Sequence, residues 1–211
     1  LASPLRHVYK RQGQQSVTLY GKDKIADQLS DTTFKISDQS FYQINSSQTE
    51  KLYQKAIEYA QLTGEETVLD TYCGIGTIGL YMASVAKHVY GVEVVPSAIK
   101  DAQQNATLNG FENTTFVCGK AEEVIIKWKQ QGIKPDVVMV DPPRKGCDET
   151  FLQTLLKLNP KRIVYISCNP STQQRDAQIL DSQYELQEIT PVDMFPQTTH
   201  VETVALFERK S

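Results

Sequence analysis

The sequence predicts an α/β fold with a mostly parallel sheet whose C-terminal edge is antiparallel. After residue 62, strand-like and helix-like segments alternate, which is the pattern of parallel strands joined by crossover helices. Residues 136–141 hold an apolar run that ends in a carboxylate, as expected for a central strand buried on both faces. The last two strand candidates have no helix between them, which predicts the antiparallel edge.

The first part of the chain is expected to hold a small antiparallel element. Residues 16–20 alternate apolar and polar side chains, residues 21–23 are typical of a turn, and residues 34–36 form another short strand candidate. We interpret residues 1–40 as the remnant of a preceding small β-rich domain and residues 41–211 as the main domain. Because the chain starts with Leu1 rather than Met, we expect it to be a fragment.

The remaining elements follow from apolar periodicity and from end signals. A helix over about residues 49–62 repeats apolar side chains every three or four positions, with Ser46 or Ser47 as its expected cap. A helix over residues 96–109 has a proline at its start and a glycine just past its end. The other expected helices are residues 78–86, 121–130, 151–158 and 171–180. The expected strands of the main domain are residues 67–70, 88–93, 115–118, 136–141, 162–167, 184–189 and 201–208.

Composition limits the class of protein. The 211 residues, 40% of them hydrophobic, suit one globular domain of ordinary size. We expect neither a signal peptide nor a membrane span, and the net charge of −3 argues mildly against nucleic-acid binding without excluding a local basic patch. The four cysteines are scattered and form no CxxC pair. This spacing argues against a metal or disulfide framework and favours reduced thiols in the cytoplasm.

A glycine-rich turn after the first strand of the main domain predicts a cofactor site. Residues 70–77 read Asp-Thr-Tyr-Cys-Gly-Ile-Gly-Thr, in which Gly74 and Gly76 allow a tight turn and close approach of a ligand. The pattern is not that of a pyrophosphate cradle, while Glu93 ends the next strand, where a carboxylate commonly binds a ribose. We infer an adenosine cofactor without phosphates, and S-adenosylmethionine fits. The alternative is an ordinary strand–turn–helix glycine and a surface glutamate.

Two more loops at strand ends carry candidate site residues. Asp141 is followed by two prolines that stiffen the loop and by Arg144, which suits a phosphate. Cys168 follows the strand over 162–167 and precedes Pro170 at the start of a helix, whose N-terminus is expected to lower the pKa of the thiol. The thiol is either a nucleophile or an inert buried cysteine.

Glu202 lies at the start of the last strand and is expected to face the same cleft from the other side. Partial desolvation raises the pKa of a carboxylate and suits it to general-base work, whereas the alternative is a strand-edge glutamate paired with a lysine. His200, two residues earlier, is expected on the same face, either orienting a substrate or as a satisfied polar residue. For Tyr165 we weigh stacking on a base against core packing, and favour the core.

Together these motifs resemble the catalytic part of the bacterial RNA uracil-5-methyltransferases, which make 5-methyluridine in tRNA and 23S rRNA. The resemblance covers about residues 16–210 and rests on residues 41–45, 70–76, 92–93, 141–144, 167–170 and 194–202. It implies a Rossmann-like class I S-adenosylmethionine-dependent methyltransferase fold with a seven-stranded sheet, and a methyltransferase catalytic domain over residues 41–211. The ending Val-Glu-Thr-Val is closer to the 23S rRNA branch, so RNA is the expected partner, rRNA before tRNA, with no obligate protein partner.

The resemblance also implies roles for individual residues. Cys168 is the expected nucleophile, at carbon 6 of a uracil, and Glu202 is the expected base. The expected cofactor contacts are Gln43, Tyr72, Gly74, Gly76, Thr77, Glu93 and Asp141. The expected substrate contacts are Phe41, Asn45, Arg144 and His200. No metal is expected.

Two other functions stay open. An amino-methyltransferase of nucleic acid or protein also uses a Pro-Pro motif after the fourth strand, although that motif usually ends in an aromatic residue where this chain has Arg144, and an exocyclic nitrogen needs no cysteine. A truncated module that binds cofactor or RNA without activity would share the same fold. The rRNA enzymes of the family usually carry an N-terminal OB-like RNA-binding domain, so site choice is expected to depend on more than these residues.

Overall fold

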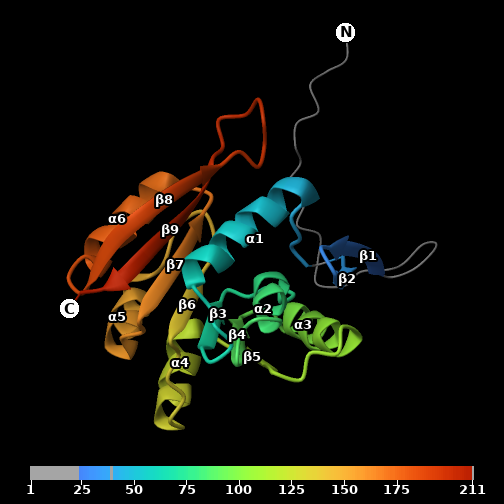
Figure 1. Ribbon diagram of the computed structural model, residues 1–211, viewed down its shortest axis with the longest axis horizontal. Coiled ribbons are helices and arrows are strands. Elements are labelled where there is room, and N and C mark those ends of the chain that lie inside the picture. Colours follow the sequence, from blue (N-terminus) through green and yellow to red (C-terminus); the bar gives the residue numbers. More distant parts are fainter. Residues whose placement is uncertain (1–23, 39, 211) are drawn as a thin grey trace.

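In the part of the chain that the structure describes, residues 24–38 and 40–210, a seven-stranded sheet lies between two layers of helices (Figure 1). The coordinates are those of a computed structural model. The strand expected at residues 16–20 and the turn at 21–23 lie outside the described residues.

The sheet has the predicted arrangement, with parallel strands followed by an antiparallel edge. Its order is β5-β4-β3-β6-β7-β9-β8. The parallel strands are β3 (Thr67–Thr71), β4 (His88–Glu93), β5 (Thr114–Cys118), β6 (Val137–Val140) and β7 (Arg162–Ser167). The antiparallel strands are β8 (Tyr184–Val192) and β9 (Glu202–Arg209). Strand order reverses between β3 and β6, and in sheets of this kind ligands bind at the carboxyl ends of the strands flanking such a reversal.

Each face of the sheet is covered by its own set of helices and its own apolar core. On one face lie α1 (Ser46–Ala60), α2 (Thr77–Ala83) and α3 (Pro96–Leu108). On the other lie α4 (Ala121–Gln130), α5 (Glu149–Leu158) and α6 (Pro170–Leu180). The four residues of β6 are all buried, because this strand meets helices on both faces.

Helix and strand ends differ from the predictions by a few residues. The cap of α1 is Asn45, whose side chain accepts a hydrogen bond from the backbone of Gln48, so the prediction of Ser46 or Ser47 was wrong. Asn is as good a cap as Ser, and three adjacent candidates cannot be ranked from sequence alone. Helix α2 ends at Ala83 rather than at residue 86, and β8 continues to Val192 rather than ending at residue 189.

A two-stranded hairpin precedes the main sheet and packs beside α3. Its strands are β1 (Lys24–Leu29) and β2 (Thr32–Ser37), paired antiparallel. Only residues 34–36 were expected as a strand, and β1 was missed because its sequence, Lys-Ile-Ala-Asp-Gln-Leu, has a single β-branched residue. Leu29, Phe34 and Ile36 are buried in the same core as α1, α2 and α3. Burial in the shared core therefore stabilises β1 although its local strand propensity is low. The domain division at residue 40 stays a prediction.

Three polar side chains, two from α3 and one from its C-terminal cap, bind the outer edge of β2. Asn105 and Asn109 each accept from and donate to one backbone residue of β2, at 2.8 to 3.2 Å, and Asp101 accepts from the backbone of Ser37 at 3.2 Å. Four helical residues rise about 6 Å and two strand residues about 6.7 Å, so side chains one turn apart meet alternate residues of the strand. We call Asp101, Asn105 and Asn109 the side-chain ladder.

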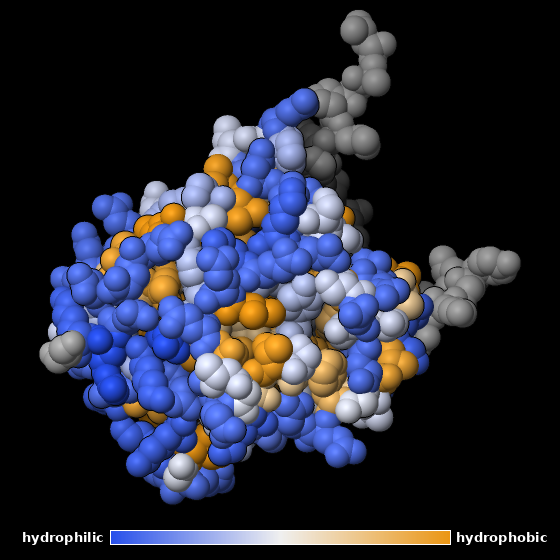
Figure 2. All heavy atoms as spheres, viewed as in Figure 1, coloured by the Kyte–Doolittle hydropathy of each residue, from blue (hydrophilic) through white to orange (hydrophobic). Residues whose placement is uncertain are grey.

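The surface agrees with this burial pattern. The face drawn in Figure 2 is mostly hydrophilic, with apolar residues in separate areas. Among the described residues, the helices are too short or too polar to cross a membrane.

Candidate active site

The glycine-rich turn between β3 and α2 has the tight conformation that its sequence predicts. Tyr72, Gly74 and Gly76 all have positive φ, at 61°, 53° and 83°. A Cβ on Gly76 would lie 3.0 Å from the ring of Phe116, so this position needs glycine for space as well as for backbone angle. Tyr72 holds an unfavourable conformation for a residue with a side chain, and strain of this kind is concentrated at functional sites.

Glu93 joins the turn to the end of β4. One carboxylate oxygen accepts a hydrogen bond from the backbone of Gly74 at 3.3 Å, and the other accepts from the backbones of Val94 and Val95 at 2.7 and 3.0 Å. The carboxylate expected at the ribose position thus lies directly beside the glycine-rich turn. Thr77 opens α2, and its hydroxyl lies 3.2 Å from the hydroxyl of Tyr53 on α1.

Asp70 is a candidate residue that the sequence reasoning missed. It lies in β3, is fully buried, and neither carboxylate oxygen meets a donor with hydrogen-bonding geometry among the described residues. Burial, followed by the charges of Asp141 and Glu93, raises its pKa to about 8, although the backbone amide of Gly79 offsets part of that rise. A carboxylate at the end of a buried strand was the available signal, and the same signal did single out Asp141.

We expect Asp70→Asn to flatten the pH dependence of stability between about pH 4 and pH 8. The folded-state pKa of Asp70, about 8, lies above the unfolded value of about 3.9, so the unfolded state releases the proton first and is favoured as pH rises. Across that window, the titration of Asp70 lowers the free energy of unfolding of the wild type by at most about 5 kcal/mol. The Asn side chain does not titrate, so the variant lacks this contribution.

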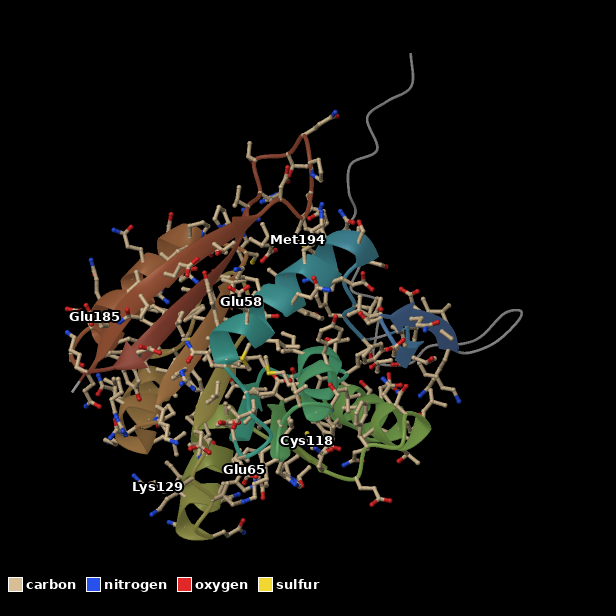
Figure 3. All side chains as sticks on the ribbon, viewed as in Figure 1. Glu58, Glu65, Cys118, Lys129, Glu185 and Met194 are labelled. Carbon is tan, nitrogen blue, oxygen red and sulfur yellow. The ribbon has the colours of Figure 1, made fainter. Side chains whose placement is uncertain are left out.

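Urea unfolding of both proteins at the two ends of this pH window measures the effect. Glu185→Gln, which changes an exposed carboxylate of β8, is the matched control and should keep the wild-type slope (Figure 3). Equal slopes for wild type and Asp70→Asn would contradict the prediction.

Cys168 and Glu202 lie next to each other at the carboxyl end of the sheet. Ser167 of β7 pairs with Thr203 of β9, and one further step along each antiparallel strand brings Cys168 opposite Glu202. A buried amide stabilises this pairing, because Gln173 donates to the carbonyl of Tyr165 at 2.9 Å and accepts from the hydroxyl of Thr203 at 2.8 Å. The predicted thiol and carboxylate therefore lie together at the carboxyl end of the sheet, where open α/β sheets form their ligand-binding crevice.

Asp141 directly follows β6 at the same end of the sheet, and its charge acts on Cys168. Its pKa is raised to about 7 by burial and then by the charge of Glu202. Burial also raises the pKa of Glu202, which is only 7% exposed, in the direction expected for a general base. A carboxylate whose charge is disfavoured by burial and by a second carboxylate suits the binding of a cation or the transfer of a proton.

The expected lowering of the Cys168 pKa was wrong. Cys168 does precede a helix, since Asn169 caps α6 and Pro170 is its first residue. Its pKa is nevertheless raised, by burial first and then by the charges of Glu202 and Asp141; its own backbone and Arg144 oppose the rise. Desolvation and two carboxylates outweigh one helix end, so the free site holds a thiol that needs a proton acceptor before it can attack.

The segment before α1 lies beside the connection between β8 and β9. The side-chain amide of Asn45 donates to the carbonyl of Met194 at 2.9 Å, and Figure 3 shows Met194 next to α1. Gln43 is half-buried in this segment, whereas Phe41 is 76% exposed. The structure thus brings the two predicted motifs together through Asn45.

His200 lies outside β9, so the strand alternation from which a shared face with Glu202 was predicted does not apply to it. Strand β9 begins at Glu202, so the alternation of a strand does not reach back to His200, which lies exposed in the preceding loop. Tyr165 is fully buried, which confirms that it packs in the core, and Cys73 is nearly fully buried as well.

Comparisons with known proteins agree with this geometry. A family model described as tRNA (Uracil-5-)-methyltransferase matches residues 8–210. A protein of Staphylococcus aureus (strain COL), described as an uncharacterized RNA methyltransferase, is 83% identical over 198 residues, which are 94% of this chain and 44% of that protein. The chain thus spans less than half the length of the curated relatives it matches.

Two solved structures extend the comparison. The Pyrococcus abyssi tRNA (uracil-54, C5)-methyltransferase in complex with S-adenosyl-L-homocysteine is similar with a TM-score of 0.78 and 35% identity, over 93% of this chain and 48% of that one. The M. jannaschii tRNA m1G37 methyltransferase has a TM-score of 0.66 and 14% identity, over 91% of this chain and 58% of that one, which shows a shared fold.

Proposed function

Because this chain belongs to the tRNA (uracil-5-)-methyltransferase family, we propose that its protein transfers a methyl group from S-adenosylmethionine to carbon 5 of a uridine in RNA. The predicted Rossmann-like methyltransferase fold is confirmed by the sheet order and by the solved relatives. The observation that carries the proposed reaction is the convergence of Cys168, Glu202 and Asp141 beside the glycine-rich turn.

The residues at the carboxyl ends of β3, β4 and β6 fit the proposed cofactor. Asp70 is a buried carboxylate without a partner among the described residues, and Asp141 and Glu93 lie near enough to affect its pKa. A ligand with sulfonium and ammonium charges would relieve this concentration of carboxylates. The proposed contacts are Gln43, Tyr72, Gly74, Gly76, Thr77, Glu93 and Asp141. When bound, S-adenosylmethionine supplies an electrophilic methyl group.

Cys168 is the proposed nucleophile, because carbon 5 of uracil is too weak a nucleophile to take a methyl group unaided. The sulfur forms a bond to carbon 6, and its proton passes to Asp141, so that Glu202 stays ionised for the later step. The ring becomes an enolate with electron density at carbon 5, where the new carbon–carbon bond would form as the bond from the methyl group to the sulfonium of the cofactor breaks, with a neutral thioether as the leaving group. Glu202 then removes the proton from carbon 5, and the bond between carbon 6 and Cys168 breaks, which restores both the ring double bond and the thiolate.

The uridine must leave any base stack to reach Cys168, so we propose that it is flipped into the crevice. We propose that Arg144, exposed after the two prolines, binds a phosphate. We also propose that Phe41, Asn45 and His200 contact the substrate; the segments that carry them are joined by the Asn45–Met194 hydrogen bond, which supports this role. We propose 23S rRNA, rather than tRNA, as the substrate, and the cytoplasm as the location.

Methyl transfer to RNA tests the proposal directly. The full-length protein and this chain are each incubated with methyl-labelled S-adenosylmethionine and with rRNA or tRNA, and the labelled nucleoside is identified by mass spectrometry. We expect 5-methyluridine, and a covalent band on denaturing gels with RNA that contains 5-fluorouridine, because fluorine cannot leave as a cation. Label on an adenine or cytosine nitrogen, without a covalent band, would instead establish an amino-methyltransferase.

A further inference from the structure

The loop over residues 141–147 is tied to α6, the helix that starts just after Cys168. The carbonyl oxygen of Arg144 accepts from the side chain of Asn169 at 3.3 Å, and the hydroxyl of Thr172, which donates to the carbonyl of Asn169 at 2.9 Å, lies 3.4 Å from it. The carbonyl oxygens of Lys145 and Cys147 both accept from Nη2 of Arg175, at 3.1 Å each. Three carbonyls of one loop are thus bound by successive turns of one helix.

Asp176 is the buried anchor of these contacts. One of its oxygens accepts from the backbone of Cys147 at 2.8 Å and from the hydroxyl of Tyr165 at 2.7 Å. The other accepts from Nε and Nη2 of Arg175, at 2.8 and 2.6 Å. A single carboxylate, with no exposed surface, therefore connects the loop, strand β7 and the arginine. We call Arg175 and Asp176 the loop clamp.

The loop lies as close to the clamp as its backbone allows. Gly146 has a φ of 78°, and a Cβ at this position would lie 2.6 Å from Nη2 of Arg175 and 2.8 Å from an oxygen of Asp176. A side chain there would displace either the loop or the clamping side chains of α6. Both the contacts and the glycine thus fix the distance between the loop and α6.

The residues that the clamp binds, Lys145 and Cys147, lie nearer in sequence to Arg144 than to Asp141. Asp141 directly follows β6 and is separated from the clamped residues by Pro142 and Pro143. Arg144 is exposed, and its charge acts on the thiol of Cys168, opposite in sign to the charges of Asp141 and Glu202. Loosening the clamp should therefore free Arg144 first and leave the two carboxylates in place.

On the basis of the function proposed above, we propose that Arg175 and Asp176 are positioning residues that hold Arg144 beside Cys168 for attack on the uracil. The two groups to be aligned lie on the two structures that the clamp joins, the loop after β6 and the start of α6. Misplacement of a catalytic group by about 1 Å costs on the order of 100-fold in rate. The clamp acts through Arg144 and does not touch the reacting atoms.

Arg175→Ala is the main test, because this side chain is half-exposed and its loss leaves no large cavity. We expect adduct formation with 5-fluorouridine RNA to slow by about 10- to 100-fold while the affinity for S-adenosylhomocysteine stays unchanged. Arg175→Lys keeps the positive charge but loses the planar set of N–H donors of the guanidinium. It should therefore recover only part of the rate of adduct formation. Arg209→Ala, which removes an arginine bound to the carbonyl of Asn159 at the far end of β9, is the matched control.

Alkylation of Cys168 by iodoacetamide, followed peptide by peptide, tests the clamp without RNA. Loss of Arg144 from the thiol should move the midpoint of the pH profile of Cys168 upward in Arg175→Ala and leave that of the exposed Cys118 unchanged (Figure 3). Asp176→Asn should give the same upward shift. An unchanged midpoint overturns the proposal, as does a loss of cofactor affinity and thermal stability together, which would mark a general folding role. A wild-type protein that forms no RNA adduct refutes the proposed function, while this assay still decides the clamp.

Discussion

Cys168→Ala is expected to abolish both methyl transfer to RNA and covalent trapping by 5-fluorouridine RNA. Removing the nucleophile of a covalent catalyst lowers turnover by a factor on the order of 10⁴ or more, because no other group in the site activates carbon 5. The thiol lies opposite Glu202 and is half-buried, so its loss leaves the glycine-rich turn and Glu93 intact. Labelled methyl incorporation and denaturing gels measure the two effects.

Cys118→Ala is the matched control for this substitution. Cys118 is an exposed cysteine at the end of β5, and its removal should leave both methyl transfer and trapping at wild-type levels. Calorimetric binding of S-adenosylhomocysteine to Cys168→Ala should match wild type and so verify the fold. Methyl transfer retained by Cys168→Ala would refute the covalent route and favour transfer to an exocyclic nitrogen.

Glu202→Gln is expected to accumulate a covalent protein–RNA adduct with ordinary uridine RNA. Attack by Cys168 and methylation both precede removal of the carbon-5 proton, so a missing base stops the reaction after the bond to sulfur has formed. Turnover should fall by about 100- to 10,000-fold, the usual contribution of a general base. The adduct is visible as a band of reduced mobility, and its carbon-5 methyl group is detected by label from the cofactor.

Glu208→Gln provides the control on the same strand. Glu208 lies near the other end of β9, where it pairs with Arg162 at 3.4 Å, and its substitution should yield no adduct and normal turnover. Because burial raises the pKa of Glu202 and a base acts in its ionised form, resolution of the wild-type adduct should speed up as pH rises through that pKa. Inactive Glu202→Gln without any adduct would place this residue before the methylation step instead.

The sequence predicted most of the sheet because its strands carry their own local signals. The apolar run that ends in Asp141, the glycine-rich turn and the residues around Cys168 each combine a strand end with a chemical group. Strand β1 has no such signal, and it forms because Leu29 is buried against helices far along the chain. The prediction for His200 depended on where β9 starts, and the alternation of apolar and polar residues does not determine the first residue of a strand.

The pKa values of the site residues could be predicted from the sequence less well than the identity of those residues. The sequence shows that a helix begins after Cys168, which would lower the pKa of the thiol. The burial and the two carboxylates that raise this pKa arise only when the ends of three strands come together in the fold. The isolation of Asp70 and the contacts of Asp176 are similarly products of packing, since each depends on which donors the fold brings near. Sequence motifs identify chemical groups, but the protonation of those groups is a property of the folded crevice.

The side-chain ladder of α3 also has a consequence for association between molecules. The edge of a β-strand exposes unpaired amides and carbonyls, which can recruit a strand from another chain and begin aggregation. In β2, the backbones of Thr33 and Lys35 are occupied on that side by Asn109 and Asn105. A helix thus closes a strand edge with amide groups instead of with another strand. Asn105→Leu, which keeps the side-chain size but removes both hydrogen-bonding groups, would reopen the middle of this edge to intermolecular pairing.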